Sequence, residues 1–363
     1  MKRIAIIADP IDNQYAGVHV YTKEMVLALV AQESAHQFIL FREKKDDLLA
    51  AYPNVKTIVI PNFIGFTAIR KFLIIPFLAR KYQVDMVIEP AHFGPFLLPK
   101  KIKRVTVIHD LSAVLFPQWH SFYSSTLQRL FLKRILRKAD LIISNSQFTS
   151  EEIIKHYPFT NAKIATIYPG IRRSVSEQTN EIDIDFKPFF LYVGTVEPRK
   201  NLTLLLEAFQ LYKEQTNSNI QLYIVGARGW KVDSFFERLA RHSYKNDIQI
   251  LGFVSNDLLR YYYQHCEAFI YPSQYEGFGF PVLEAMQEGA TCITTAESSM
   301  SEISYPYALY FQNNVSTSLL NAMYQVPSFK LTNSVEEIQL HIKKYSWNNF
   351  AKEFLAYIDK LYI

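Results

Sequence analysis

Two glutamates and two glycines lie close together where an apolar strand-like run leads into a helical pattern. Residues 271–286 read YPSQYEGFGFPVLEAM, with Glu276 and Glu284 eight positions apart and Gly277 and Gly279 between them. Glycines let a ligand approach the backbone closely, and backbone amides at the start of a helix favour a phosphate. Carboxylates beside such an anion site suit a ligand that carries both hydroxyl groups and a diphosphate.

The helix in this stretch is bounded by residue types that commonly begin and end a helix. Pro281 suits the first turn and Gly289 suits the end, which predicts a helix over 281–288. Glu276 is then expected in the preceding loop and Glu284 in the first turn. A purely structural corner fits the same pattern, with Glu284 complementing the helix dipole and Glu276 solvated.

Two cations stand directly before another helical segment. Residues 193–209 read VGTVEPRKNLTLLLEAF, which predicts a strand end, a tight turn and a helix with Asn201 as its N-cap. Arg199 and Lys200 precede this helix, whose dipole repels positive charge unless an anion binds there. They are therefore candidates for phosphate binding, and a pair of solvated loop charges is the alternative.

Two further candidates follow strand-like runs in the first half of the chain. Gly17, in the stretch 8–24, would let a phosphate approach the first helix, although no GxGxxG fingerprint is present. His109 and Asp110 follow the run TVI and are expected at the end of a strand. A single histidine at such a position is more often structural than functional.

Apolar runs alternate with amphipathic stretches along the chain, a pattern typical of parallel sheets covered by helices on both faces. The predicted strands are 2–8, 36–41, 56–61, 84–89, 104–109 and 140–145, then 188–194, 220–226, 247–253, 267–272 and 290–295. We therefore expect an α/β chain with two Rossmann-like domains, 1–172 and 173–345, with 173–185 as a polar linker. The segment 346–363 is expected to form a helix that returns to the first domain. Because ligands bind at the carboxyl ends of parallel strands, the expected site is a cleft between facing domains.

Composition narrows the class of protein. The chain has 363 residues, 49% of them apolar, and no run that resembles a signal peptide or a membrane span, which predicts a cytoplasmic protein. Cys266 and Cys292 stand outside any reactive motif and are expected to be packed thiols. Residues 1–172 hold 23 Lys and Arg against 13 Asp and Glu, whereas the rest holds 16 against 21. The first domain is therefore expected to meet an anionic partner.

Basic residues flank apolar ones at two places in this basic half. Arg70, Lys71, Arg80 and Lys81 border the run FLIIPFLA, and Lys133, Arg134, Arg137 and Lys138 share one end of a helical pattern. This arrangement predicts peripheral contact with anionic lipid at the inner face of a membrane. A solvated basic face over a core helix fits the pattern equally well.

Together, these stretches resemble family 4 of the retaining glycosyltransferases, which have the GT-B fold. EGFGFPVLEAM (276–286) carries that family's E-x7-E signature, EPRKN (197–201) resembles its diphosphate-binding turn, and IHDLSAVLFPQW (108–119) resembles its acceptor-domain histidine segment. GARGW, GFVSNDLLRYYY, SEI and YSWNNFAKEF match further patterns in order. The resemblance spans nearly the whole chain.

The resemblance implies how the donor is bound. Glu284 would accept hydrogen bonds from the ribose of a nucleotide sugar, whereas Glu276 would hold the transferred sugar. The backbone of Gly277, Phe278, Gly279 and Phe280 would bind the adjoining phosphate. Arg199 and Lys200 would offset the charge of the leaving diphosphate.

The resemblance also places His109 against the donor sugar and Gly17 under the phosphates, and it implies that the anomeric configuration is retained. Since no residue stands out as a covalent nucleophile, we expect front-face attack, with the leaving phosphate accepting the acceptor's proton. No cofactor and no metal are expected. Asp183 and Asp185 match a short DxD metal motif, but they lie in the polar linker and are interpreted as linker.

The segments GTVEPRKN and GARGW look most like bacterial mannosyltransferases of surface-polysaccharide assembly. This likeness implies GDP-mannose as donor and a saccharide or lipid-linked saccharide as acceptor, with no nucleic-acid partner. A UDP-hexose donor is the alternative within the family. An epimerase or phosphorylase of the GT-B fold, or a non-catalytic saccharide-binding protein, would not require both E-x7-E and EPRKN.

Overall fold

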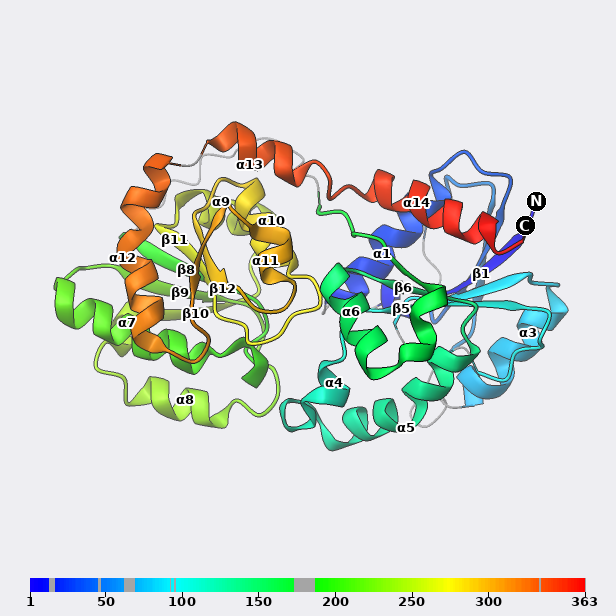
Figure 1. Ribbon diagram of the computed structural model, residues 1–363, viewed down its shortest axis with the longest axis horizontal. Helices are drawn as coiled ribbons and strands as arrows, with labels where there is room; N and C mark the ends of the chain where they lie inside the picture. The colour runs from blue at the N-terminus through cyan, green and yellow to red at the C-terminus, as the bar shows by residue number, and fades with distance from the viewer. Residues whose placement is uncertain are drawn as a thin grey trace. The chain divides into compact units, whose positions relative to one another are not determined.

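The computed structural model describes residues 1–12, 17–44, 47–61, 69–91, 93–94, 96–172, 187–332 and 334–362. They form two compact units, each built on one parallel β-sheet (Figure 1). Unit 1 consists of Met1–Leu115, Phe122–Gly170 and Tyr345–Ile363, and unit 2 consists of Phe116–Ser121 and Ile171–Lys344. The linker predicted over 173–185, with Asp183 and Asp185, lies outside the described residues.

Unit 1 contains a seven-stranded sheet in the order β3-β2-β1-β4-β5-β6-β7, with every neighbouring pair parallel. Its strands are β1 Arg3–Ile7, β2 Gln37–Arg42, β3 Val55–Val59, β4 Met86–Glu89, β5 Lys103–Ile108, β6 Leu141–Ser144 and β7 Ile164–Thr166. Strands β4 and β6 are buried along their whole length, as their continuous apolar sequences require when helices cover both faces.

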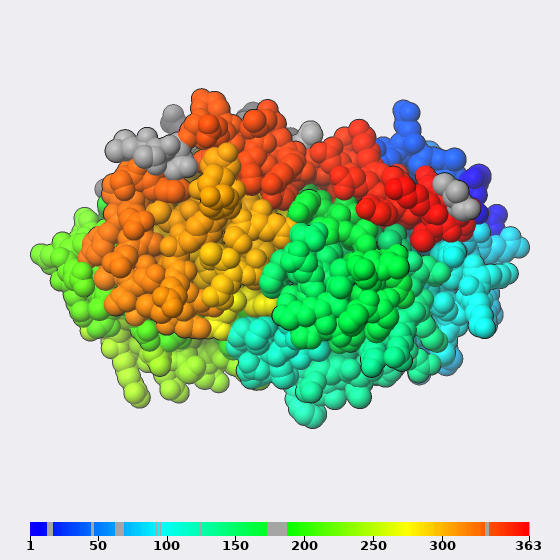
Figure 2. All heavy atoms as spheres, in the orientation of Figure 1, coloured from blue at the N-terminus to red at the C-terminus, as the bar shows by residue number. Residues whose placement is uncertain are grey.

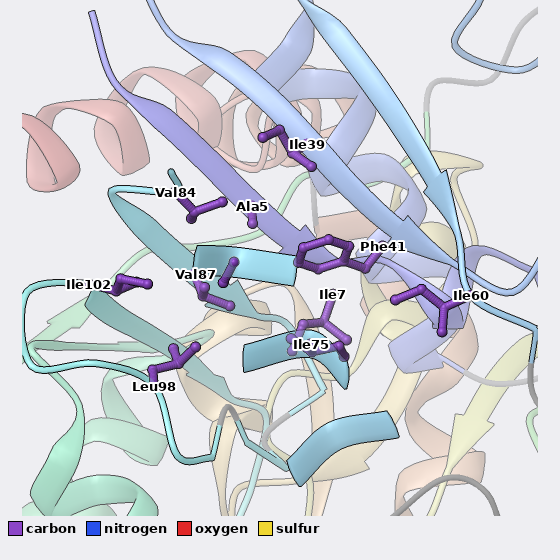
Figure 3. Packing of buried hydrophobic residues seen from close by; sticks show 11 residues of the cluster. Ala5, Ile7, Ile39, Phe41, Ile60, Ile75, Val84, Val87, Leu98 and Ile102 are labelled. Atoms are coloured by element: carbon purple, nitrogen blue, oxygen red, sulfur yellow. The ribbon is translucent and has the colours of Figure 1, made fainter. Parts of the chain in front are cut away.

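A hydrophobic cluster of unit 1 joins the sheet to helix α3 (Ile75–Lys81), as Figure 3 shows. Ile75 of α3 belongs to the same cluster as Ile7 of β1 and Val87 of β4. Because side chains alternate along a strand, Glu89 points to the same face of β4 as Val87. This apolar layer therefore ends in a carboxylate at the carboxyl end of β4.

Unit 2 contains a six-stranded parallel sheet in the order β10-β9-β8-β11-β12-β13. Its strands are β8 Phe189–Val193, β9 Gln221–Val225, β10 Ile248–Gly252, β11 Ala268–Tyr271, β12 Cys292–Thr295 and β13 Ala308–Phe311. The predicted α/β class with two Rossmann-like sheets is confirmed. The sequence analysis did not predict β7 or β13, which are edge strands of three and four residues; β7 is too short to show a pattern, whereas β13 has an apolar run, ALYF, that was overlooked.

Helices surround both sheets. Those of unit 1 are α1 Gly17–Val30, α3 Ile75–Lys81, α4 Ser112–Leu115, α5 Phe122–Lys138, α6 Gln147–His156 and α14 Trp347–Lys360, with shorter turns η1 Asp9–Asp12, η2 Arg70–Ile74 and η4 Pro158–Lys163. Those of unit 2 are α7 Leu202–Thr216, α8 Asp233–Ala240, α9 Asn256–His265, α10 Phe280–Gln287, α11 Ser299–Ser304, α12 Ser316–Thr332 and α13 Val335–Ile342, with η3 Pro117–Trp119, η5 Pro198–Lys200 and η6 Lys245–Asp247. Several begin with a serine whose hydroxyl accepts a hydrogen bond from the amide three residues on, as Ser346 does at the start of α14.

Helix α14 groups with unit 1 although it follows all of unit 2 in the sequence. Phe350, Phe354 and Ile358 are buried at helical spacing, and the helix contacts α1. A Cβ atom on Gly170 would lie 2.2 Å from the amide nitrogen of Trp347, so the chain approaches the start of α14 very closely. Figure 2 shows the atoms of α14 in red beside the blue and green atoms of unit 1.

Candidate active site

The carboxyl ends of β8 and β11 are neighbours in the sheet of unit 2. The chain proceeds from β8 to β9 on one side and from β11 to β12 on the other, so the strand order reverses between β8 and β11. Open parallel sheets bind ligands at such a reversal. The residues that follow these two strands include EPRKN (197–201) and the first glutamate of E-x7-E.

Close packing of two turns fixes the path of the chain after β8. A Cβ atom on Gly226 would lie 2.2 Å from the carbonyl oxygen of Gly194, and Gly226 has a φ of 136°. The Val196 amide donates to the Ala227 carbonyl across the same contact. Glycine is therefore needed at position 226, in the GARGW segment, to let the turn after β8 settle on the turn after β9.

Glu276 lies at the centre of a buried ion cluster formed by the residues after β8 and β11. Its Oε1 atom is 2.5 Å from Lys200 Nζ, and its Oε2 atom is 3.0 Å from Arg199 Nη1. The hydroxyls of Ser273 and Tyr271 also donate to Oε1, at 2.5 Å and 3.2 Å. Glu276 is only 6% exposed and Lys200 only 7%. The carboxylate therefore has donors from four side chains and little contact with solvent.

The cluster is electrically balanced. Burial raises the pKa of Glu276, but the nearby Arg199 and Lys200 outweigh it and hold that pKa below its ordinary value of 4.5. Arg199 also donates from Nη2 and Nε to Glu197 Oε1, at 2.9 Å and 3.2 Å, so two cations meet two carboxylates. The alternative of two solvated loop charges is wrong, because both cations are paired with carboxylates of the chain and Lys200 is buried.

The residue that follows these cations also differs from expectation. Asn201 precedes α7, but it has a left-handed φ of 54° and makes no side-chain cap bond to that helix. Its amide group donates instead to Asn314 Oδ1, at 3.1 Å. The prediction that the Asn201 side chain caps α7 is therefore wrong, although the helix starts where it was predicted to start.

Glu284 lies on α10 in a different environment. It is the fifth residue of that helix, so its predicted place in the first turn is wrong by one position. The Tyr263 hydroxyl donates to its Oε2 atom at 3.4 Å. Burial raises the pKa of Glu284, and the charge of Arg172 and the Tyr263 hydroxyl offset only part of that effect. The two glutamates of E-x7-E thus differ in how fully their negative charge is compensated.

The loop between the two glutamates is held by backbone contacts. Gly279 has a φ of 101°, and a Cβ atom there would lie 2.2 Å from the end of Met300. The Ser299 hydroxyl donates to the carbonyls of Glu276 and Phe278, at 3.0 Å each. Phe278 is buried, and its ring lies 5.0 Å from that of Phe280. This loop, which includes Gly277, therefore has a defined shape.

The other two predicted site residues, Gly17 and His109, belong to unit 1. Gly17 is the exposed first residue of α1, and a Cβ atom added there would meet no atom of the described residues within 4 Å. His109 Nε2 lies 2.7 Å from the Pro90 carbonyl oxygen, and the His109 ring meets Tyr21 of α1 edge-on at 4.6 Å. Burial lowers the pKa of His109, so its neutral ring donates the Nε2 hydrogen to that carbonyl. Asp110 accepts from the Ser112 amide at 2.8 Å and so supports the start of α4.

The structure brings Arg199, Lys200 and Glu276 into direct contact and adds three residues that the sequence analysis missed. Glu197, Tyr271 and Ser273 complete the cluster. Each lies in a stretch that was already singled out, but a sequence does not show which way a hydroxyl or carboxylate points.

Within the part of the chain that the structure describes, no group of three or more His, Cys, Asp or Glu side chains is placed to hold a metal ion. Cys266 and Cys292 are buried free thiols, as predicted, and burial raises the pKa of Cys266 to about 12. No described helix is both long enough and apolar enough to cross a membrane.

Two family models match the chain in succession. The model for glycosyltransferase family 4 matches residues 15–175, and the model for glycosyl transferases group 1 matches residues 175–326. The O-antigen chain mannosyltransferase B of Escherichia coli is 35% identical over 222 residues, which span 58% of this chain and 58% of that protein. The chain belongs to the family 4 glycosyltransferases, and it matches little more than half the length of this relative.

Solved structures share the fold. Sucrose-phosphate synthase from Thermosynechococcus elongatus matches with a TM-score of 0.75 at 20% identity, over 100% of this chain and 99% of that one. HepE from Anabaena, in complex with UDP-glucose, matches with a TM-score of 0.73 at 15% identity, over 98% and 100%. These likenesses establish the GT-B fold.

The opposite environments of the two glutamates predict opposite effects of the same substitution on stability. The folded-state pKa of Glu276 is lowered, so its charge stabilises the fold above pH 4.5 and this contribution is lost as pH falls through the folded pKa. Glu276→Gln should therefore reduce the free energy of unfolding at pH 7 by about 3 kcal/mol, because a buried pair loses its negative partner.

Glu284 is the matched control on the same loop and helix. Its pKa is raised, so ionisation at neutral pH opposes folding, and Glu284→Gln should leave the free energy of unfolding unchanged or raise it. Urea unfolding at pH 7 measures both effects. A loss of stability in Glu284→Gln as large as that in Glu276→Gln would contradict this account of the two sites.

Proposed function

We propose that this protein transfers mannose from GDP-mannose, with retention of anomeric configuration, onto a saccharide or lipid-linked saccharide acceptor. The observation that carries the proposal is the buried cluster of Glu276, Arg199 and Lys200 at the strand reversal of unit 2. The relative named as an O-antigen chain mannosyltransferase supports mannose as the sugar. The proposal places the reaction in the cytoplasm.

In this proposal the cluster is the diphosphate end of the donor site. Arg199 and Lys200 lie in η5, which follows β8, and in the proposal they donate to the phosphate oxygens. A diphosphate that accepts hydrogen bonds from these two cations weakens their hold on Glu276. The Glu276 carboxylate, still positioned by the Ser273 and Tyr271 hydroxyls, then accepts from the hydroxyls of the sugar.

The other candidate residues have separate tasks. Glu284 accepts from the ribose hydroxyls, because an incompletely compensated carboxylate gains most from new donors. The backbone of Gly277, Phe278, Gly279 and Phe280 lies between the two glutamates and binds phosphate. His109 presents a neutral ring to the donor sugar, and Gly17, the first residue of α1, lies under the phosphates.

Charge on the leaving diphosphate is offset by Arg199 and Lys200, so the proposal includes no metal ion. The diphosphate takes the proton from the acceptor hydroxyl as that hydroxyl attacks from the same face. The alternative donor is a UDP-hexose. HepE, which has the same fold, is in complex with UDP-glucose and supports this alternative. A non-catalytic saccharide-binding protein is the second alternative.

A donor panel tests the function. GDP-mannose should raise the melting temperature more than UDP-glucose, since a ligand that binds only the native state stabilises it. GDP should be released from GDP-mannose, faster when a mannoside acceptor is added, and EDTA should leave the rate unchanged. Release of UDP alone would establish the alternative donor, and no release from any sugar nucleotide would establish the non-catalytic reading. Full loss of rate with EDTA, restored by Mn²⁺, would overturn metal independence.

Substitution of one glutamate should affect mainly donor binding, and substitution of the other should affect mainly the rate of catalysis. Glu284→Ala should raise the donor KM about tenfold with little change in kcat, because the ribose contact is the same in ground and transition states. Glu276→Gln, which keeps shape but not charge, should lower kcat at least 100-fold and bind GDP almost normally, since positive charge develops on the sugar as the diphosphate leaves. Steady-state kinetics with GDP titrations measure both. Near-normal turnover in both variants would show that the corner is only structural.

We also propose that unit 1 contacts anionic lipid, where a lipid-linked acceptor would lie. Two of the residues expected to contact lipid, Arg70 and Lys71, do not face it. Arg70 is fully buried and paired with Asp9, and Lys71 is mostly buried beside Glu89, so neither faces lipid. Arg80 and Lys81 on α3 are exposed, as are Lys133, Arg134, Arg137 and Lys138 on α5.

Exposed apolar side chains accompany these cations. Leu73 and Phe77 are 60% and 62% exposed, and on α5 Phe122, Tyr123 and Leu130 are 85%, 74% and 68% exposed. Neither the segment 70–81 nor α5 contains an acidic residue. The two segments are neighbours, because Phe72 contacts Phe131 with ring centroids 6.2 Å apart. Cations beside exposed apolar groups match an anionic bilayer surface, at about 1 kcal/mol for each cation near the surface.

Vesicle binding tests this contact. The protein should sediment with vesicles of phosphatidylglycerol and phosphatidylcholine at low salt, and binding should fall as salt rises. Lys133→Glu with Arg137→Glu should weaken it at least tenfold, whereas Arg238→Glu with Lys245→Glu, two exposed positions in unit 2, should not. Equal binding to neutral and anionic vesicles would refute the contact.

A further inference from the structure

The sheet of unit 1 has its own reversal of strand order, between β1 and β4. The chain proceeds from β1 to β2 on one side and from β4 to β5 on the other. This is the position that, in unit 2, lies between β8 and β11 and carries the buried ion cluster. In unit 1, Asp9 follows β1 and Glu89 ends β4, so acidic residues again flank the reversal. Open parallel sheets bind ligands at this position.

Glu89 is fully buried but incompletely satisfied. Its Oε1 atom accepts from the Ala91 amide at 3.0 Å. Its Oε2 atom has no hydrogen-bond partner among the residues that the structure describes, and the nearest cation, Lys71 Nζ, is 3.8 Å away. Buried carboxylate oxygens without a donor are rare, because an unmatched oxygen costs its full desolvation energy. This oxygen lacks one donor.

A second unsatisfied atom lies beside it. Glu89 pairs in register with Thr106 of β5, so the two side chains emerge on the same face of the sheet. The Thr106 hydroxyl is also buried with no partner among the described residues. Two neighbouring buried polar groups therefore have no hydrogen-bond partner among the described residues.

The nearby loop supplies features that suit a sugar. Lys71 Nζ donates to the Phe93 carbonyl at 3.1 Å and lies 5.3 Å from the centre of the Phe93 ring. The side chain of Lys71 is 15% exposed and Phe93 is partly exposed, whereas the side chain of Glu89 has no exposed surface. A hydroxyl oxygen about 2.8 Å from both Lys71 Nζ and Glu89 Oε2 would bridge them, accepting from one and donating to the other.

We propose that Glu89 and Lys71 form a hydroxyl-binding subsite for the saccharide acceptor, with the Phe93 ring against the apolar face of the sugar. This proposal rests on the proposed function, since it names where unit 1 holds the group that is extended. Glu89 and Lys71 contact the acceptor and take no part in breaking the donor bond.

The electrostatics of the site support this reading. Burial raises the pKa of Glu89 to about 7, and the charge of Lys71 and the Ala91 amide offset only part of that effect. Asp9 raises it slightly further, and Arg70 lowers it slightly. A buried carboxylate that served only the fold would have donors for both of its oxygens. Glu89 instead becomes more stable when a ligand brings a donor.

The sign of the pH dependence follows. Below pH 7 Glu89 is protonated and no longer a strong acceptor, and above pH 7 it is ionised and accepts from a sugar hydroxyl. Acceptor binding should therefore strengthen as pH rises from 6 to 8. The wild-type fold should lose stability as pH rises from about 4.5 to 7 and change little above pH 7, because in that window the unfolded chain ionises this carboxyl while the folded protein keeps it protonated.

Binding of methyl α-D-mannopyranoside to the GDP-loaded protein, followed by NMR titration at pH 6 and pH 8, tests the subsite. Glu89→Gln should weaken binding about tenfold at pH 8 and abolish the difference between the two pH values. Lys71→Met should weaken it at both pH values, and it provides a second test if Glu89→Gln folds poorly. Asp140→Asn is the control. It removes a carboxylate that accepts from Lys103 Nζ and the Arg104 amide at the amino-terminal end of β5, so it should leave the affinity for the mannoside unchanged.

Equal affinity in wild type, Glu89→Gln and Lys71→Met would overturn the subsite and show that Glu89 holds internal water only. Failure of the wild type to bind the mannoside while it turns over GDP-mannose would also overturn it. If no sugar nucleotide is used but Glu89→Gln still loses mannoside binding, the proposed transfer fails and the subsite stands. The two proposals therefore fail separately.

Discussion

The buried carboxylate of Glu276 constrains the arrangement of unit 2 around its sheet edge. Removing an ionised carboxylate from water is costly unless charged and hydrogen-bonding partners replace the water. Here the partners come from two loops that are more than 70 residues apart in sequence, since Lys200 and Arg199 follow β8 whereas Ser273 follows β11. The loops are also joined directly, because the Gln274 amide donates to the Arg199 carbonyl at 2.9 Å. One charge thus holds together the ends of two strands.

The packing of the sheet makes this arrangement achievable. Gly226 lets the turn after β8 lie against the turn after β9, and Gly279 lets the chain reverse into α10 beside Met300. Each glycine occupies a position where a Cβ atom would overlap a neighbour. The two glycines therefore allow the close packing of the loops that carry the cations and the carboxylate.

Local patterns in the sequence predict the strands and the main site residues, but they do not identify contacts between distant segments. Apolar runs such as FFLYV predict buried strands, whereas the three-residue edge strand β7 is too short to show a pattern. Arg199 and Lys200 are found from their place before a helix, yet their partner Glu276 lies 76 or more positions away. Arg70 illustrates the same limit, because a basic residue beside an apolar run looks alike whether it faces lipid or pairs with Asp9.

The two sheets present the same topological position with opposite electrostatic states. At the reversal between β8 and β11, the charge of Glu276 is met by cations and hydroxyls, so its geometry is set before any ligand arrives. At the reversal between β1 and β4, none of the described residues donates to one oxygen of Glu89, and burial raises the pKa of Glu89 to about 7. A preorganised charge suits the stabilisation of a transition state, since no reorganisation is needed when charge develops. An undercompensated charge suits reversible binding, because the ligand completes a hydrogen bond that the fold leaves unmade. The difference between the two carboxylates therefore matches the different demands of a donor that reacts and an acceptor that must bind and leave.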